Sequence, residues 1–331
     1  MAVKKKEGAG GRGLVIASDL GGTNLRAAAI DETGRIVERY KQNTPKAETS
    51  GEMLSAFVTA ARDLMNRRSL AGAPIRELAI AVPGTVNAFE GVVMRAPNVP
   101  CLDGFRLAAA LEEELSIPAI LENDANAAAV GEMWQGAARE HKSIICLTLG
   151  TGVGGGIILD GELWRGIDGT AAEIGHMVVE PNGQPCACGG RGCLEIYASA
   201  TAIVRMTREM RPRYPNSPLH TAEDLTAANI YRRGLEGDEL AREVFRRVGF
   251  YLGVGMTSLI NLLNPEMIVI GGGAAAGWDL FYDHAIEQVN SRAFAVPARR
   301  ARIVQAVCGD DAGLLGVAHL AFTAWQKSSD K

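Results

Sequence analysis

The fold of this chain is indicated by one short segment near its start, Leu14-Val-Ile-Ala-Ser-Asp-Leu-Gly-Gly-Thr23. The apolar beginning of the segment predicts a buried strand, and its end predicts a glycine-rich turn directly after Asp19. A second apolar run, Leu25–Ile30, follows at once, and a turn signal at 31–34 separates it from a third run, Arg35–Tyr40. The chain is therefore expected to open as a β-meander.

The same arrangement returns about 130 residues later. A strand-like run, Ile144–Thr148, leads into the glycine turn Gly150-Thr-Gly-Val-Gly154, and another run, Gly156–Leu159, ends at Asp160-Gly161. Self-similarity at a fixed offset is the sequence signature of a duplicated unit. We therefore predict two related lobes, each of which carries a Gly-Thr hairpin.

Helical and strand-like runs alternate elsewhere in the chain, and this alternation is typical of an α/β fold. Helices are predicted at 51–68, 105–115, 198–210, 237–263 and 312–325, strands at 77–82, 118–121 and 267–270, and a surface loop at 211–218. The predicted boundaries are a disordered tail at 1–13, a smaller α/β lobe at 14–125 and a larger α/β lobe at 126–311. A closing helix at 312–326 is expected to pack back on the smaller lobe.

Composition excludes several classes of protein. The chain has 331 residues, of which 47% are hydrophobic and 22% are charged, so it can build real cores and does not resemble a disordered chain. Its formal net charge of -4 argues against binding to nucleic-acid phosphates as the main function. No apolar run approaches the ~20 residues of a membrane helix, and the charged start does not resemble a secretory signal. We expect a soluble cytoplasmic enzyme with no membrane or nucleic-acid partner.

The two glycine turns suit a polyphosphate ligand, because successive backbone N–H groups in such turns can point at phosphate oxygens. Asp19, at the end of its strand, could hold Mg²⁺, and a third glycine cluster lies at Gly271–Gly273. No lysine follows a glycine, which excludes a standard P-loop. A GxGxxG pattern begins at Gly150, but it leads into a predicted strand and not into the helix that dinucleotide binding requires. The alternative for each turn is simply a tight turn.

Asp124 stands where a predicted strand runs into the alanine-rich segment Glu122-Asn-Asp-Ala-Asn-Ala-Ala-Ala129. Such an Asp commonly caps a helix N-terminus. Taken alone, the residue is better explained as a cap, but it could also act as a general base, since Asp accepts the proton of the attacking hydroxyl in phosphoryl transfer to alcohols. Both interpretations stay open at this point.

A cluster of metal-ligand residues lies at 176–195. His176, Cys186, Cys188 and Cys193 form a complete tetrahedral zinc set, and four protein ligands indicate a structural metal. Glu173 and Glu195 flank this loop. They are either surface charges or groups that orient a polar ligand.

These motifs together resemble the ROK family of bacterial sugar kinases. The resemblance rests on Asp19–Arg26, Glu122–Asn126, Gly150–Gly156, Glu173–His176 and the CxCGxxGCxE run from Cys186 to Glu195, and it extends from about residue 14 to 325. It implies a two-lobed actin-like ATPase (ribonuclease H-like) fold with duplicated βββαβαβα lobes and a structural zinc loop. It also implies a homodimer or dimer of dimers, and ATP-dependent phosphorylation of a hexose at its 6-hydroxyl.

The resemblance assigns roles to individual residues. Asp124 would be the catalytic base, and His176 would bind zinc through one ring nitrogen and the sugar through the other. The implied sugar-binding residues are Gly84, Asn98, Asn123, Asp124, Glu173, His176 and Glu195. The implied MgATP-binding residues are Asp19, Gly21, Gly22, Thr23, Gly150, Thr151, Gly152, Gly154 and Gly272, the last of these near the adenosine.

One position departs from the family pattern, because Ala172 stands where the family commonly has Gly before Glu173. The added methyl group is expected to alter how closely the sugar approaches. Glucose is the expected acceptor, and the alternatives are N-acetylmannosamine, N-acetylglucosamine and fructose. Repressors of the same family carry a DNA-binding domain before the kinase-like part, and about a dozen residues before the first strand leave no room for one. We therefore expect an enzyme.

Overall fold

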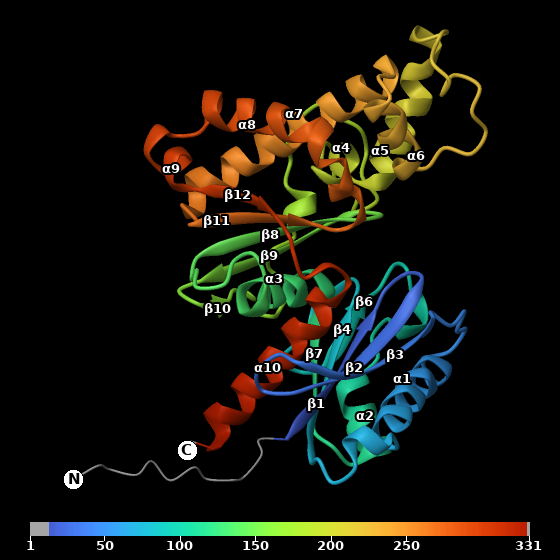
Figure 1. The fold of residues 1–331 in the computed structure, drawn as a ribbon, viewed down its shortest axis with the longest axis vertical. Coiled ribbons are helices and arrows are strands. Elements are labelled where there is room, and N and C mark those ends of the chain that lie inside the picture. The colour runs from blue at the N-terminus through green and yellow to red at the C-terminus, as the bar shows by residue number, and fades with distance from the viewer. Residues whose placement is uncertain (1–12, 330–331) are drawn as a thin grey trace. The chain divides into compact units, whose positions relative to one another are not determined.

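The computed structural model describes residues 13–329, and its chain divides into two units (Figure 1). Of the described residues, those up to Asp124 and those from Val317 onward form the first unit, and Ala125–Gly316 form the second. The tail predicted at 1–13 lies outside the described residues except for Gly13, which is buried against the Pro74 carbonyl.

The first unit is built on a five-stranded sheet of order β3-β2-β1-β4-β7. Its strands are β1 (Leu14–Leu20), β2 (Asn24–Ile30), β3 (Ile36–Asn43), β4 (Ile75–Val82) and β7 (Ala119–Asn123). The first three strands form the predicted antiparallel meander, and β4 and β7 run parallel to β1. A small hairpin that the sequence did not predict, β5 (Thr85–Asn87) and β6 (Val92–Arg95), follows β4.

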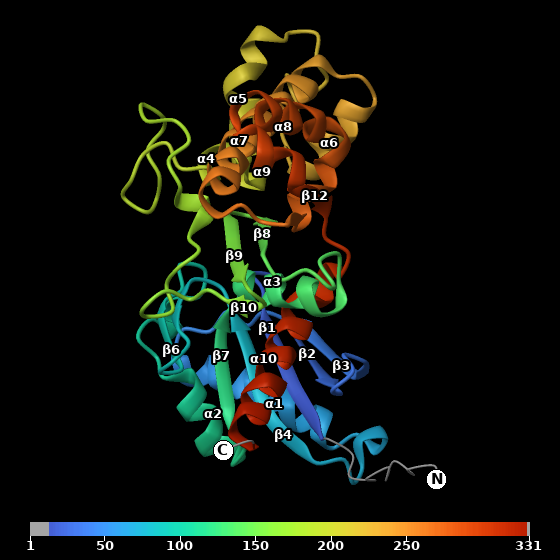
Figure 2. The same cartoon turned by 90° about the vertical axis from the view of Figure 1, so that its left-hand side faces the viewer.

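Helices cover both faces of this sheet. The helices α1 (Ser50–Met65) and α2 (Leu107–Leu115) lie on one face, and the part of α10 (Ala312–Ser329) from Val317 onward lies on the other (Figure 2). The helix α1 begins with a capping box between Thr49 and Glu52, which satisfies free backbone donors at its N-terminus. Its apolar face, which includes Phe57 and Leu64, is buried in the core of the unit.

The second unit repeats the same sheet order as β10-β9-β8-β11-β12, which confirms the predicted duplication. Its strands are β8 (Ile144–Leu149), β9 (Val153–Leu159), β10 (Glu162–Leu163), β11 (Met267–Gly271) and β12 (Arg302–Gln305). Its helices are α3 (Asp124–Gln135, counted from Ala125), α4 (Glu195–Ala198), α5 (Ala200–Met210), α6 (Ala227–Leu235), α7 (Glu239–Leu263), α8 (Trp278–Arg292) and α9 (Ala295–Arg300). The sequence did not predict α6, α8, α9 or β12.

The helix predicted at 198–210 is confirmed as α5, but it begins two residues later than predicted, because a break at Ser199 separates it from α4. Ser199 has an extended backbone, and its hydroxyl accepts a hydrogen bond from the backbone nitrogen of Ala202 at the start of α5. Serine is a favoured N-cap residue, and here its cap begins a new helix. The break places Glu195 at the start of its own short helix.

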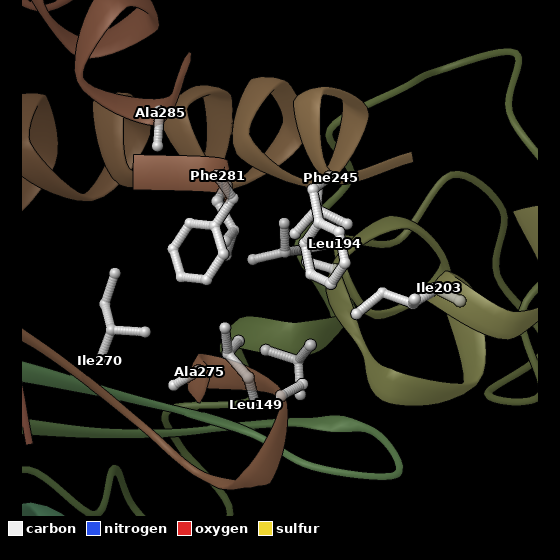
Figure 3. Close-up of a cluster of buried hydrophobic side chains, with 14 of the residues drawn as sticks. Leu149, Leu194, Ile203, Phe245, Ile270, Ala275, Phe281 and Ala285 are labelled. Atoms are coloured by element: carbon white, nitrogen blue, oxygen red, sulfur yellow. The ribbon is translucent and has the colours of Figure 1, made fainter. Parts of the chain in front are cut away.

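The core of the second unit lies between its sheet and the long helices α7 and α8. Phe245, Phe281 and Ile270 are almost completely buried in it, together with Leu149 from the end of β8 and Leu194 from the segment before α4 (Figure 3). One hydrophobic cluster therefore holds both the end of β8, which leads into the second glycine turn, and the segment that leads to Glu195. Among residues 13–329, no helix has the length and apolar character needed to cross a membrane.

Candidate active site and metal centre

In the first unit, the predicted site residues gather where the parallel strands end. Asp19 on β1 pairs with Ala81 on β4, and Val82 on β4 pairs with Asn123 on β7. Neighbouring strands lie about 4.8 Å apart. The register therefore brings Asp19, the turn after β4 and Asn123 to one edge of the sheet, where α/β folds commonly bind ligands.

The first glycine hairpin joins β1 to β2 through Gly21, Gly22 and Thr23. The Gly21 backbone nitrogen donates to the Asn24 carbonyl (2.9 Å), and the Gly21 carbonyl accepts from the Thr44 hydroxyl (2.6 Å). A Cβ on Gly22 would meet no atom within 4 Å, so packing does not require glycine there. An open backbone at this position suits close approach of a ligand.

The carboxylate of Asp19 lies 3.7 Å from the guanidinium of Arg26, its pairing partner on β2. The ion pair fixes the side chain of Asp19 beside the hairpin. Sequence reasoning missed the roles of Arg26 and Thr44, because both depend on strand pairing.

The segment at the end of β7 carries the candidate base. The side-chain amide of Asn123 donates to the Gly84 carbonyl (2.9 Å) and to Oδ1 of Asp124 (3.1 Å). Asp124 is the first residue of α3. The three residues form one hydrogen-bonded group, and Asn123 orients the carboxylate of Asp124.

Gly84 has φ +99°, and a Cβ there would overlap the carbonyl of Arg95 on β6. Only glycine fits this position without strain. Nearby, Asn98 is exposed in the loop after β6, and Asp103 anchors that loop by accepting from the Ala96 backbone nitrogen (2.7 Å). Sequence reasoning named Gly84 and Asn98 but missed Asp103.

In the second unit, the hairpin between β8 and β9 contains Gly150, Thr151 and Gly152. The Gly150 nitrogen donates to the Gly152 carbonyl (2.9 Å), which closes the turn. Beside it, Gly272 has φ +87°, and a Cβ there would press on the backbone of Leu149. The second and third glycine clusters of the sequence therefore meet at the ends of β8 and β11.

Glycines 154 to 156 have a packing reason of their own. They lie within β9, and added Cβ atoms would crowd Ala125 at Gly154, Ile174 at Gly155 and Ala129 at Gly156. Close contact of α3 with β9 therefore accounts for glycine at 154. The expected contact of Gly154 with nucleotide stays a prediction.

The four predicted metal ligands converge. The donor atoms of His176, Cys186, Cys188 and Cys193 all lie within 4.8 Å of one another. The Sγ atoms of Cys188 and Cys193 are 3.7 Å apart, and Nδ1 of His176 is 3.8 Å from Sγ of Cys186. An ion about 2.3 Å from each of two tetrahedral sulfur ligands requires a sulfur–sulfur separation of about 3.8 Å. The donor set therefore fits a tetrahedral metal ion.

The second ring nitrogen of His176 lies near a carboxylate. Its Nε2 atom lies 4.0 Å from Oε2 of Glu173. Partial burial raises the pKa of Glu173, His176 acts in the opposite direction, and the charge of Glu195 raises this pKa further. Glu173 and His176 are thus close enough to share one polar ligand.

The residue before Glu173 has an unusual backbone. Ala172 has φ +67°, in the left-handed region that favours glycine. This conformation gives a physical reason for the glycine that the family commonly has there.

Comparison with known proteins covers almost the whole chain. The model of the ROK family matches residues 15–324. A glucokinase of Halalkalibacterium halodurans is 36% identical over 303 residues, which span 90% of this chain and 92% of the relative. The crystal structure of a ROK family glucokinase from Streptomyces griseus in complex with glucose and AMPPNP is 33% identical, with a TM-score of 0.79, and covers 94% of this chain and 100% of that chain. A xylose repressor of Caldicellulosiruptor bescii is 28% identical over 92% of this chain and 77% of its own length.

The family match, the repeated sheet order and the joined Cys–His and carboxylate motifs agree with one another. The chain therefore belongs to the ROK family and has its two-lobed α/β sugar kinase fold.

Proposed function

We propose that this protein is an ATP-dependent glucokinase, which transfers the γ-phosphoryl group of MgATP to the 6-hydroxyl of glucose. The observation that carries the proposal is the group formed by Gly84, Asn123 and Asp124, in a chain similar to glucokinases over nine-tenths of its length. A positioned carboxylate beside polar groups is what phosphoryl transfer to an alcohol needs.

Asp124 is proposed to accept the proton of the sugar 6-hydroxyl as the oxygen attacks the γ-phosphorus. The amide of Asn123, which donates to Oδ1 of Asp124, holds the carboxylate in one orientation. The oriented carboxylate is then the proton acceptor. The products are hexose 6-phosphate, ADP and a proton that Asp124 passes to water.

The hexose hydroxyls are proposed to pair with the remaining polar groups of the site. The groups that the family resemblance implies for this role are, in the second unit, Glu173, His176 and Glu195. In the first unit they are Asn98, Asn123 and the backbone at Gly84. A buried hydroxyl left without a partner costs ~1–3 kcal/mol. Sugars that misplace one hydroxyl are therefore rejected.

Each glycine hairpin is proposed, on the family resemblance, to contact nucleotide phosphates through its own backbone. The donors are backbone N–H groups at Gly21, Gly22 and Thr23 and at Gly150, Thr151 and Gly152, with Gly154 beside them and Gly272 near the adenosine. Asp19 would hold Mg²⁺ through water. When bound, Mg²⁺ neutralises the charge that develops on the phosphates.

We propose that the metal site of His176, Cys186, Cys188 and Cys193 takes zinc. Three thiolates and an imidazole are ligands that zinc prefers, and the backbone N–H of Gly190, which donates to Sγ of Cys188, lowers the pKa of that thiol. Four protein ligands leave no open position, so zinc would organise the loop and take no part in the chemistry.

Glucose is proposed over fructose, N-acetylglucosamine and N-acetylmannosamine on the similarity to glucokinases. A coupled assay of ADP release over these four sugars tests the choice. Glucose should give the highest kcat/KM, and a higher value for an acetylated sugar would contradict it. Phosphorylation of none of them would favour the second candidate, a sugar-responsive regulator, which the similarity to a xylose repressor supports.

The proposed assembly is a homodimer in the cytoplasm, and it rests on the family resemblance alone. Light scattering of the purified protein measures the mass directly. One chain has a mass of 35.1 kDa, so a particle of that mass would contradict the dimer.

A further inference from the structure

The nucleotide hairpin of the second unit is attached to the segment that follows the last metal ligand. The Val153 nitrogen donates to Oε2 of Glu195 (3.0 Å), and the Ala200 nitrogen donates to the Gly150 carbonyl (2.9 Å). The Thr201 hydroxyl donates to the Thr151 carbonyl (2.8 Å). The hairpin that is proposed to bind phosphate therefore contacts Glu195, which is proposed to bind sugar.

The carboxylate of Glu195 also occupies the space that a side chain at 152 would take. The three atoms nearest to a Cβ added on Gly152 all belong to Glu195, and the nearest of them, Oε2, would overlap it. At Gly150, in the same hairpin, the nearest atom to an added Cβ is the Gly152 carbonyl oxygen at 4.0 Å. A Cβ at 152 would therefore displace the carboxylate of Glu195, whereas a Cβ at 150 would displace nothing.

One hydrophobic cluster holds both sides of this contact. Leu149 directly precedes the hairpin, Leu194 directly precedes Glu195, and both side chains are fully buried in the core between the sheet and α7 (Figure 3). Protein cores are close-packed, so they resist separate movement of their parts. The hairpin and Glu195 are therefore positioned as one piece.

We infer that Glu195 couples the binding of sugar to the binding of nucleotide, and that Gly152 is a positioning residue for the sugar site. This inference rests on the proposed function. A carboxylate can accept about four hydrogen bonds, so Glu195 can keep its bond from Val153 while it accepts one from a sugar hydroxyl. A nucleotide that orders the hairpin fixes the carboxylate for the sugar, and by thermodynamic reciprocity the sugar favours the nucleotide equally.

Calorimetric titration of glucose with and without Mg-AMPPNP tests the coupling. In the wild type, the Kd for glucose should fall by about fivefold or more when Mg-AMPPNP is present. Gly152→Ala displaces the carboxylate, so its Kd for glucose without nucleotide should rise about tenfold, the effect of one misplaced hydrogen bond. Gly51→Ala on α1, where an added Cβ would meet no atom within 4 Å, is the matched control and should bind glucose without nucleotide as the wild type does.

A folded Gly152→Ala protein that binds glucose as tightly as the wild type would overturn the inference. If circular dichroism shows that this variant does not fold, Glu195→Asp replaces it, because the shorter side chain withdraws from the Val153 nitrogen. For this variant, the Kd for glucose without Mg-AMPPNP divided by the Kd with Mg-AMPPNP should fall toward one. A ratio equal to that of the wild type would overturn the inference. A wild type that phosphorylates no hexose overturns the proposed function instead, so the two failures are distinct.

Discussion

His176 Nδ1 lies 3.8 Å from Sγ of Cys186, while Nε2, on the other side of the same ring, lies 4.0 Å from the carboxylate of Glu173. The ring can therefore bind a metal with one nitrogen and a sugar hydroxyl with the other. A bound metal fixes the tautomer and the orientation of such a ring.

The first prediction follows from this arrangement. Cys188→Ser should lower the zinc content and raise the KM for glucose by about 10–100-fold, the usual effect of losing a supporting ligand. The KM for ATP should change much less, because Ala200 and Thr201 still hold the nucleotide hairpin. Metal analysis and steady-state kinetics measure both effects. Cys101→Ser, outside the cluster, is the control, and a zinc-free wild type with full activity would contradict the prediction.

Backbone strain at one residue gives the second prediction. Ala172→Gly should increase the free energy of unfolding by up to about 1 kcal/mol, because φ +67° costs an L-residue about that much more than glycine. Chemical denaturation of the zinc-loaded protein measures the change. Ala171→Gly is the matched control, since Ala171 does not have a positive φ. It should give no gain, and equal gains for both variants would refute the strain at Ala172.

A raised pKa gives the third prediction. Partial burial, aided by the charge of Glu112, raises the pKa of Glu77 on β4 to about 7. The folded chain then holds this proton more tightly than the unfolded chain, whose Glu pKa is about 4.3. The contribution of Glu77 to stability is therefore full below about pH 4.3 and is lost as the pH rises to about 7.

Glu77→Gln removes this dependence on pH. Relative to the wild type, Glu77→Gln should therefore be more stable at pH 8 than at pH 5. Urea denaturation at both pH values measures the difference between the two free energies of unfolding. Glu113→Gln, at an exposed position on α2, is the control. If the free energy of unfolding of Glu77→Gln differs from that of the wild type by the same amount at both pH values, Glu77 does not titrate between them.

The sequence predicted those parts of the fold that depend on local pattern. Alternation of apolar runs with glycine turns gave the meander and its duplication, and the spacing of Cys and His gave the four-ligand cluster. The start of the helix predicted at 198 was placed two residues early, because the capping role of Ser199 depends on its side-chain hydrogen bond and not on the apolar pattern.

The parts of the site that depend on register could not be predicted in this way. Asp19, Gly84 and Asn123 are far apart in the sequence, and only the pairing of β1, β4 and β7 brings them to one edge. The reason for Gly152 was hidden as well, because the carboxylate that excludes a side chain there belongs to Glu195. Contacts of this kind have no local signature.

The rate of the chemical step in Asp124→Asn tests the central claim most directly. The amide keeps the size of the carboxylate but cannot accept the proton of the 6-hydroxyl, so a single turnover of MgATP and glucose should slow by about 10²–10⁴-fold. Thermal unfolding and the Kd for glucose should stay close to the wild type, and Asp63→Asn, an exposed exchange on α1, should retain full activity. A folded Asp124→Asn protein that transfers phosphate at near-normal rate would contradict the assignment of Asp124 as the base.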